Sequence, residues 1–406
     1  MLKLFNIYAI LRLSAIAFPL ITITLTNELN PFLKIFSLKI ISLGWIGAAF
    51  FANEFYKDLY NSLLENDYKL ISNLKKYINL QIWQFFITVP IIVYLFKANN
   101  FLEGVTLIIF LISEKIFDEV QRVLQFLDVS SKYYTFYLLT KRSLFTLNFI
   151  ILAFIKSPYY YSLIQICIYC LIILLISFLF LYKGLKRTSI INSNPCHLII
   201  KKLTNIRNLE KFKKSIPIKP FITTIIITIS SSIPSYYFAT IIPNNYFKET
   251  MESYLFSYRL FSIPFIILIT YHFPLIRDKI RKNPYLRKLS NDYRFNSLNL
   301  LSIFYVFVFV LLNFILQEDT IKQFSISLLA VIIANGFHYI DDLIFWRVDI
   351  NLRAITAFLN ISAWAISYFI LYRTNNFEIV FIPLSYLIIK TTTTFLIFRF
   401  TNKKVS

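Results

Sequence analysis

The sequence has few of the residues that usually build catalytic or cofactor sites. Its 406 residues include three cysteines, three histidines and five glycines. Three cysteines argue against a disulfide framework, and His197, His272 and His338 have no metal-ligand spacing. Glycine is too scarce for a loop that cradles phosphate. We therefore predict that the chain is not an enzyme and that it uses no metal or cofactor.

Charge is also scarce. Charged residues make up 16% of the chain and hydrophobic residues 57%, whereas a soluble domain is about a quarter charged. Apolar runs of about twenty residues recur from end to end, the length needed to cross a hydrocarbon layer about 30 Å thick. No long polar region could fold as a separate soluble domain. Lipid is therefore the expected solvent for most of the chain.

Two of the cysteines have the C-x-x-C spacing found in redox and metal sites. Cys167 and Cys170 lie inside an apolar run, whereas a redox or metal role requires a polar and accessible environment. We interpret both as small packing residues within a helix.

Twelve apolar segments are candidate transmembrane helices. They are Phe5–Thr26, Phe32–Ala52, Ile78–Phe96, Phe101–Phe126, Tyr133–Ile155, Tyr159–Tyr182, Phe221–Ile242, Thr250–His272, Leu298–Leu316, Ser325–Phe345, Ile355–Leu371 and Ile379–Phe398. Lysine and arginine concentrate in the loops that follow even-numbered segments. Cytoplasmic loops are enriched in these residues, so both termini are predicted to be cytoplasmic. The net charge of +21 is then a topology signal, and no nucleic-acid partner is expected.

The twelve segments divide into two sets of six with the same expected orientation. Polar landmarks recur at an offset of about 220 residues, as in parallel-repeat transporters. Lys57-Asp58 aligns with Arg277-Asp278, for example. We predict an all-α integral membrane protein with two parallel six-helix bundles around a central cavity. The bundles comprise residues 1–182 and 219–406, joined by a basic cytoplasmic linker, 183–218.

Four cationic side chains fall at membrane depth in the first, second and eighth segments: Arg12, Lys34, Lys39 and Arg259. Ionisable groups at this depth are costly and usually face the bundle interior. One interpretation is a cavity that receives an anionic head group, because arginine has forked donors suited to phosphate. In the other, Lys34 extends to the outer surface and the remaining cations pair with acids on neighbouring helices.

A second group of buried charges has mixed sign and lies toward the cytoplasm. Its members are Glu114, Lys115, Asp118, Glu119 and Arg122 in the fourth segment, Lys141 and Arg142 in the fifth, and His338, Asp341 and Asp342 in the tenth. Opposite charges stand four residues apart in the fourth segment, as in Lys115 and Glu119, so this helix can pair much of its own charge. The tenth segment is expected to take a cation from Lys141 or Arg142. The group is either a structural ion-pair network, or an inner gate or cation-coupling site.

The layout and several stretches of sequence resemble a known family. The residues after the second and eighth segments, Glu54–Tyr60 and Phe273–Ile280, and the exit of the fourth, Val120–Phe126, carry the likeness. They resemble the polysaccharide-transporter (O-antigen flippase) branch of the multidrug/oligosaccharidyl-lipid/polysaccharide exporter superfamily. In related peptidoglycan-precursor flippases, cations on spans one, two and eight line the cavity. The resemblance therefore implies that Arg12, Lys39 and Arg259 bind substrate.

The function that this resemblance implies is a flippase in the bacterial cytoplasmic membrane. It would move a polyprenyl-diphosphate-linked oligosaccharide (an O-antigen, capsule or exopolysaccharide unit) to the outer leaflet by alternating access. Expected partners are membrane lipids, H⁺ or Na⁺ as the coupling ion, and glycan-assembly proteins. Two alternatives stay open: a cation-coupled multidrug exporter of the same fold, and a membrane enzyme of glycan assembly such as a polysaccharide polymerase.

Overall fold

The structure is a computed structural model. It describes residues 7–50, 70–126, 131–156, 158–187, 218–242, 250–282, 293–315, 319–336 and 350–372, with a few positions between 384 and 396. These ranges are helical and contain no strand. The predicted all-α fold is therefore confirmed, whereas membrane insertion and the two six-helix bundles remain predictions.

The chain forms two compact units, Met1–Thr228 (unit 1) and Ile229–Ser406 (unit 2). Most of the predicted linker, 183–218, lies outside the described ranges. Unit 1 contains α1 (Ile7–Leu25), η2 (Thr26–Glu28), α2 (Pro31–Phe50), α4 (Leu70–Leu95), α5 (Phe101–Phe126), α6 (Ser131–Ile155) and α7 (Tyr159–Arg187). The apolar segments predicted from the sequence account for most of each of these long helices.

Polar residues set several helix ends in unit 1. The side-chain oxygens of Asn30 and Asn100 each accept the backbone N–H three residues further on, at 2.9 Å, which caps the first turns of α2 and α5. Lys97 follows α4 and Lys156 follows α6, with φ of 48° and 49°. This left-handed conformation commonly ends a helix. Short turns of this kind return the chain directly into the next helix.

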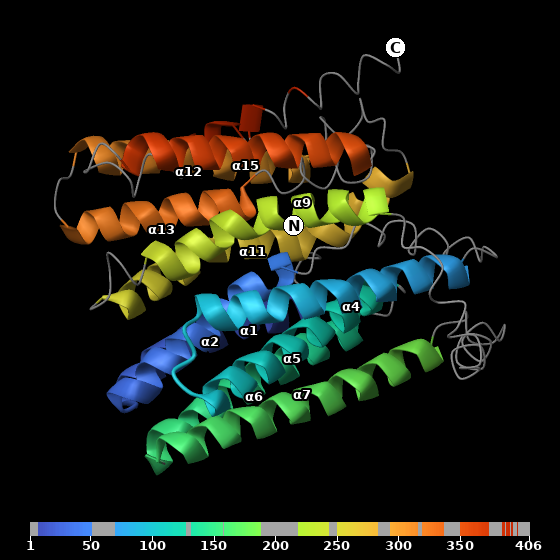
Figure 1. The fold of residues 1–406 in the computed structure, drawn as a ribbon, viewed down its shortest axis with the longest axis vertical. Coiled ribbons are helices and arrows are strands. Elements are labelled where there is room, and N and C mark those ends of the chain that lie inside the picture. The colour runs from blue at the N-terminus through green and yellow to red at the C-terminus, as the bar shows by residue number, and fades with distance from the viewer. Residues whose placement is uncertain are drawn as a thin grey trace. The chain divides into compact units, whose positions relative to one another are not determined.

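Within unit 1, α5 lies along α7 and α1 lies along α6 (Figure 1). The α1–α6 contacts advance in the same direction on both helices, since Ala15 meets Arg142 and Thr22 meets Thr146. The contacts between α5 and α6 run in opposite directions. Thus α1 and α6 are parallel and α5 is antiparallel to α6, the alternation expected of consecutive membrane spans.

In unit 2, three long helices pack against one another: α11 (Met251–Lys282), α12 (Tyr293–Ile315) and α13 (Asp319–Asn335). The other elements are α9 (Ile218–Tyr236), which crosses the boundary between the units, the π-helix η5 (Tyr237–Ile241) and α15 (Ile350–Tyr372). Fully buried Tyr254 on α11 donates to the Phe238 carbonyl of η5 at 2.9 Å. Tyrosine hydroxyls thus satisfy backbone carbonyls inside this unit.

Two segments among the described residues are long and apolar enough to cross a membrane, Thr135–Ile155 in α6 and Tyr159–Lys183 in α7. Shorter apolar stretches lie in α4, α12, α13 and α15. Length and composition alone do not separate a membrane span from the core helix of a soluble protein. The side chains on the outward faces of the helices bear on whether these helices lie in lipid.

Candidate functional site

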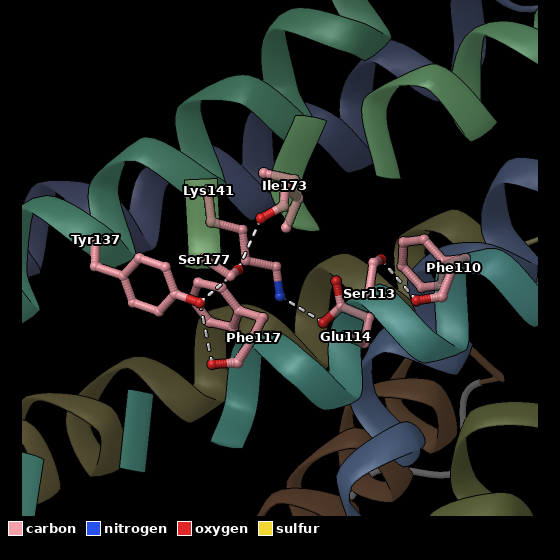
Figure 2. Close-up of polar contacts among 8 residues, drawn as sticks. All are labelled: Phe110, Ser113, Glu114, Phe117, Tyr137, Lys141, Ile173 and Ser177. Atoms are coloured by element: carbon pink, nitrogen blue, oxygen red, sulfur yellow. Dashed lines mark hydrogen bonds and ion pairs between the residues drawn. The ribbon is translucent and has the colours of Figure 1, made fainter. Parts of the chain in front are cut away.

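An ion pair lies inside unit 1, between α5 and α6. The Lys141 ammonium stands 2.5 Å from the Glu114 carboxylate, and the two side chains are only 15% and 14% exposed. Lys141 Nζ also lies 3.9 Å from the centroid of the Phe117 ring, within the range of a cation–π contact. Figure 2 shows the two ionised groups pointing toward each other from neighbouring helices. Each of the two charges therefore has an opposite charge as its neighbour.

A tyrosine–serine pair adjoins the ion pair and links α6 to α7 (Figure 2). Buried Tyr137 donates to Ser177 Oγ at 2.7 Å, and Ser177 donates to the Ile173 carbonyl at 2.7 Å. The Tyr137 ring stacks on Phe117 with centroids 4.5 Å apart. Phe117 therefore contacts both the ammonium and the tyrosine, which joins α5, α6 and α7 in one polar cluster.

A second ion pair lies within α5 and begins at the residue after Glu114. Lys115 forms an ion pair with Glu119, four residues further on the same helix, and the Tyr77 hydroxyl of α4 also donates to Glu119. The predicted self-pairing of charge in this segment is confirmed for Lys115 and Glu119. The contribution of Tyr77 was not predicted, because it comes from a different helix.

The two cations of α6 have partners within unit 1. The sequence indicated that Lys141 or Arg142 would serve the acids of the tenth segment. Lys141 pairs with Glu114, and Arg142 Nη1 donates to the Ala15 carbonyl of α1 at 3.0 Å. Asp341 and Asp342 of the tenth segment lie outside the described residues, so their pairing with a cation of α6 remains a prediction.

A buried carboxylate that the sequence analysis did not single out lies at the other end of α5. Glu103 is 2% exposed and accepts the Asn99 backbone N–H at 2.7 Å, the Asn99 amide at 3.1 Å and the Tyr159 hydroxyl. The available signal was the Asn-x-x-Glu spacing of Asn100 and Glu103, which is typical of a helix N-terminus. Glu103 ties the start of α5 to the start of α7.

The three predicted substrate-binding cations belong to different parts of the chain. Lys39 on α2 is half-buried in unit 1 and donates to the Lys97 carbonyl at 3.1 Å. Arg259 is half-buried on α11 in unit 2. Arg12 lies on α1, and its side chain is outside the described part of the structure. Their convergence on one cavity remains a prediction, because it joins two units.

Of the remaining predicted gate residues, some lie in the described part of the structure and others do not. Asp118 is half-buried on α5, one turn after Glu114. The side chain of Arg122 is not among those described, and His338, Asp341 and Asp342 fall in the undescribed range 337–349. The structure thus brings together Glu114 with Lys141 and Lys115 with Glu119 from the predicted gate.

The two cysteines of the C-x-x-C spacing are free thiols on α7. Cys170 is fully buried, and Cys167 Sγ lies 3.4 Å from the Thr106 hydroxyl of α5. Both residues contribute to the α5–α7 contact, in agreement with their interpretation as packing residues.

Comparisons with protein-family models, curated proteins and solved structures give no significant match to this chain.

Proposed function

We propose that the chain is a multi-pass membrane transporter that moves a lipid-linked anionic oligosaccharide, of the polyprenyl-diphosphate type, across the bacterial cytoplasmic membrane. The observation that carries this proposal is the distribution of side chains in unit 1. Its helices turn large apolar side chains outward and keep ionised and hydrogen-bonded groups inside. This is the arrangement expected when lipid surrounds a polar interior.

The outward face of α7 is the clearest case. Six apolar or aromatic side chains along this face are 46–66% exposed: Ile164, Ile168, Leu171, Leu175, Phe178 and Tyr182. They recur every three or four residues, so they form one continuous stripe along the helix. Full exposure of an Ile, Leu or Phe side chain to water costs about 1.5–3 kcal/mol relative to burial, so each of these half-exposed side chains would cost roughly half as much in water. A hydrocarbon environment removes this cost, which supports a lipid-facing position for the stripe.

The opposite face of α7 supports the same proposal. Cys170 and Ser177 are fully buried there, and Ser177 takes part in the cluster around Glu114 and Lys141. Glu114 stands about 20 Å along α5 from the helix start, at a rise of 1.5 Å per residue. Ionised groups at such depth inside a membrane protein commonly serve a transport pathway. Pairing Glu114 with Lys141 lowers the free-energy cost of burying the two charges but keeps both charges in the interior.

The substrate assignment comes from the resemblance and from the chemistry of the cations. A diphosphate requires several donors at once, and arginine and lysine supply them. The Lys39 ammonium has three N–H donors, of which the hydrogen bonds found in the described residues use one, to Lys97. Among the described residues, the Glu103 carboxylate accepts hydrogen bonds from Asn99 and Tyr159 and not from Lys39. Lys39 therefore retains donors for an anion.

Reconstitution tests this proposal. The purified chain is placed in liposomes with a fluorescent polyprenyl-diphosphate disaccharide in both leaflets, and outer-leaflet label is bleached with dithionite. The protein is expected to render nearly all the label bleachable, whereas empty liposomes allow about half. Lys39→Ala and Arg259→Ala are expected to slow the exchange at least tenfold. Lys34→Ala, five residues before Lys39 on α2, is the matched control.

Two outcomes would overturn the proposal. A wild-type chain that is folded and inserted but leaves half the label protected would exclude lipid-linked substrates of this class. Wild-type rates in both Lys39→Ala and Arg259→Ala would exclude the cationic site. Movement of an organic cation such as ethidium, without movement of the lipid, would favour the exporter alternative.

A further inference from the structure

Helix α1 has a proline in its interior. Pro19 lies between Ile7 and Leu25 and has no backbone N–H. In an α-helix the N–H of residue 19 would bond to the carbonyl of residue 15, so Pro19 deprives the Ala15 carbonyl of its helical donor. Ala15 is fully buried. A buried carbonyl without a donor is costly, and another group has to satisfy it.

That donor comes from α6. Arg142 Nη1 donates to the Ala15 carbonyl at 3.0 Å, across 127 residues of sequence. One turn later, the buried Thr146 hydroxyl donates to the Phe18 carbonyl at 3.1 Å. Arg142 and Thr146 are four residues apart, so they lie on one face of α6. This face of α6 thus bonds to two carbonyls of α1, those of Ala15 and Phe18, just before the proline that interrupts the backbone ladder.

A threonine of α1 completes the contact. Thr22 Oγ1 donates to the same Phe18 carbonyl at 2.9 Å and lies 2.8 Å from Thr146 Oγ1. Both threonines are buried. Neighbouring helices and Ser/Thr hydroxyls commonly satisfy backbone groups freed by proline in membrane helices. Here the guanidinium bonds to the Ala15 carbonyl that the proline exposes, and the two threonine hydroxyls bond to the Phe18 carbonyl.

We propose that Arg142 is a positioning residue that replaces the backbone donor removed by Pro19, and that it thereby fixes the segment Ile7–Phe18 of α1. This segment carries Arg12, three residues before Ala15. The consequence for substrate rests on the proposed function and on the predicted role of Arg12 in binding the diphosphate. Arg142 therefore supports the predicted substrate site indirectly, through its hydrogen bond to the Ala15 carbonyl inside unit 1.

A double-mutant cycle on the purified full chain in detergent tests the role of Arg142 directly. Arg142→Met should lower the thermal unfolding midpoint by about 4–8 °C, because a charge-assisted bond is lost and a buried carbonyl is left without it. Pro19→Ala restores an N–H at position 19, which can bond to Ala15. In that background the same Arg142→Met change should cost less than half as much. Lys156→Met, at the exposed turn after α6, should show equal effects in both backgrounds.

Additive effects of Pro19→Ala and Arg142→Met would overturn the proposal, as would an unchanged midpoint in Arg142→Met alone. If Arg142→Met does not fold, Arg142→Lys supplies the measurement, since a lysine keeps the charge and has a single donor group. Arg142→Lys should then lower the thermal unfolding midpoint in the Pro19 background, and it should lower the midpoint only a little in the Pro19→Ala background. Equal losses in the two backgrounds would again contradict the assignment.

The transport measurement separates this inference from the proposed function. In liposomes, Arg142→Met should raise the KM for the polyprenyl-diphosphate substrate, and adding Pro19→Ala should return it toward the wild-type value. A wild-type chain that moves no such lipid would refute the proposed function, while the thermal cycle would still decide the role of Arg142. A KM unchanged by Arg142→Met, in a chain that is active, would refute the link to Arg12.

Discussion

The ion pair of Glu114 and Lys141 offers a quantitative test of the polar interior of unit 1. Replacing Lys141 by Met keeps an unbranched side chain but removes the ammonium that lies over the Phe117 ring. The Glu114 carboxylate, 14% exposed, then has no ammonium at 2.5 Å. Replacing both residues by Met removes both charges and leaves apolar side chains of similar volume. The two variants therefore separate the cost of an isolated charge from the net value of the pair.

The magnitude follows from burial. Breaking a fully buried pair costs about 3–5 kcal/mol, whereas replacing both partners by apolar residues is often neutral or stabilising. Since about a seventh of each side chain remains exposed, we expect Lys141→Met to cost about 2–4 kcal/mol. This corresponds to a change of about 30- to 700-fold in the unfolding equilibrium constant. The Glu114→Met/Lys141→Met variant should lie within about 1 kcal/mol of wild type.

Unfolding of the purified protein in dodecyl maltoside by increasing SDS, followed by tryptophan fluorescence, measures these differences. Lys183→Met, an exposed lysine near the end of α7, serves as a control for loss of one positive charge. If Lys141→Met costs no more than this control, the isolated Glu114 carboxylate does not carry the expected penalty. A double variant less stable than Lys141→Met would also contradict the prediction, because the pair would then stabilise the fold through something other than charge compensation.

Two further predictions concern the end of α5 and the surface of α7. Glu103→Gln should destabilise the protein by about 1–3 kcal/mol in the SDS titration, because a carboxylate that accepts from Asn99 and Tyr159 becomes an amide with its own donors; equal stability would show that these bonds contribute little. Leu175→Lys should reduce the membrane-inserted fraction by the equivalent of about 2.5–3.5 kcal/mol if α7 faces lipid, measured by carbonate extraction. An unchanged or more soluble Leu175→Lys protein would contradict the membrane assignment, because the 62% exposed Leu175 would then face water.

Within the described residues, sequence alone determined most of the helices that form and much of where they end. The predicted segment Phe101–Phe126 has the same bounds as α5, and Tyr159 begins α7 as predicted. Long apolar runs bounded by asparagine, proline and lysine leave the backbone few alternatives to a helix with a turn at each end. The Lys115–Glu119 pair was accessible for the same reason, because residues four apart share a helix face whatever the helix packs against.

Only the tertiary structure decided the partners between helices. Lys141 pairs with Glu114, 27 residues away, and Arg142 reaches the Ala15 carbonyl, 127 residues away. Glu103 meets Tyr159 across 56 residues. Several acids and carbonyls were equally plausible partners in the sequence, since pattern fixes the face of a helix and not the helix that it meets. Packing selects one partner, because a buried charge or carbonyl must be satisfied by the groups that lie beside it.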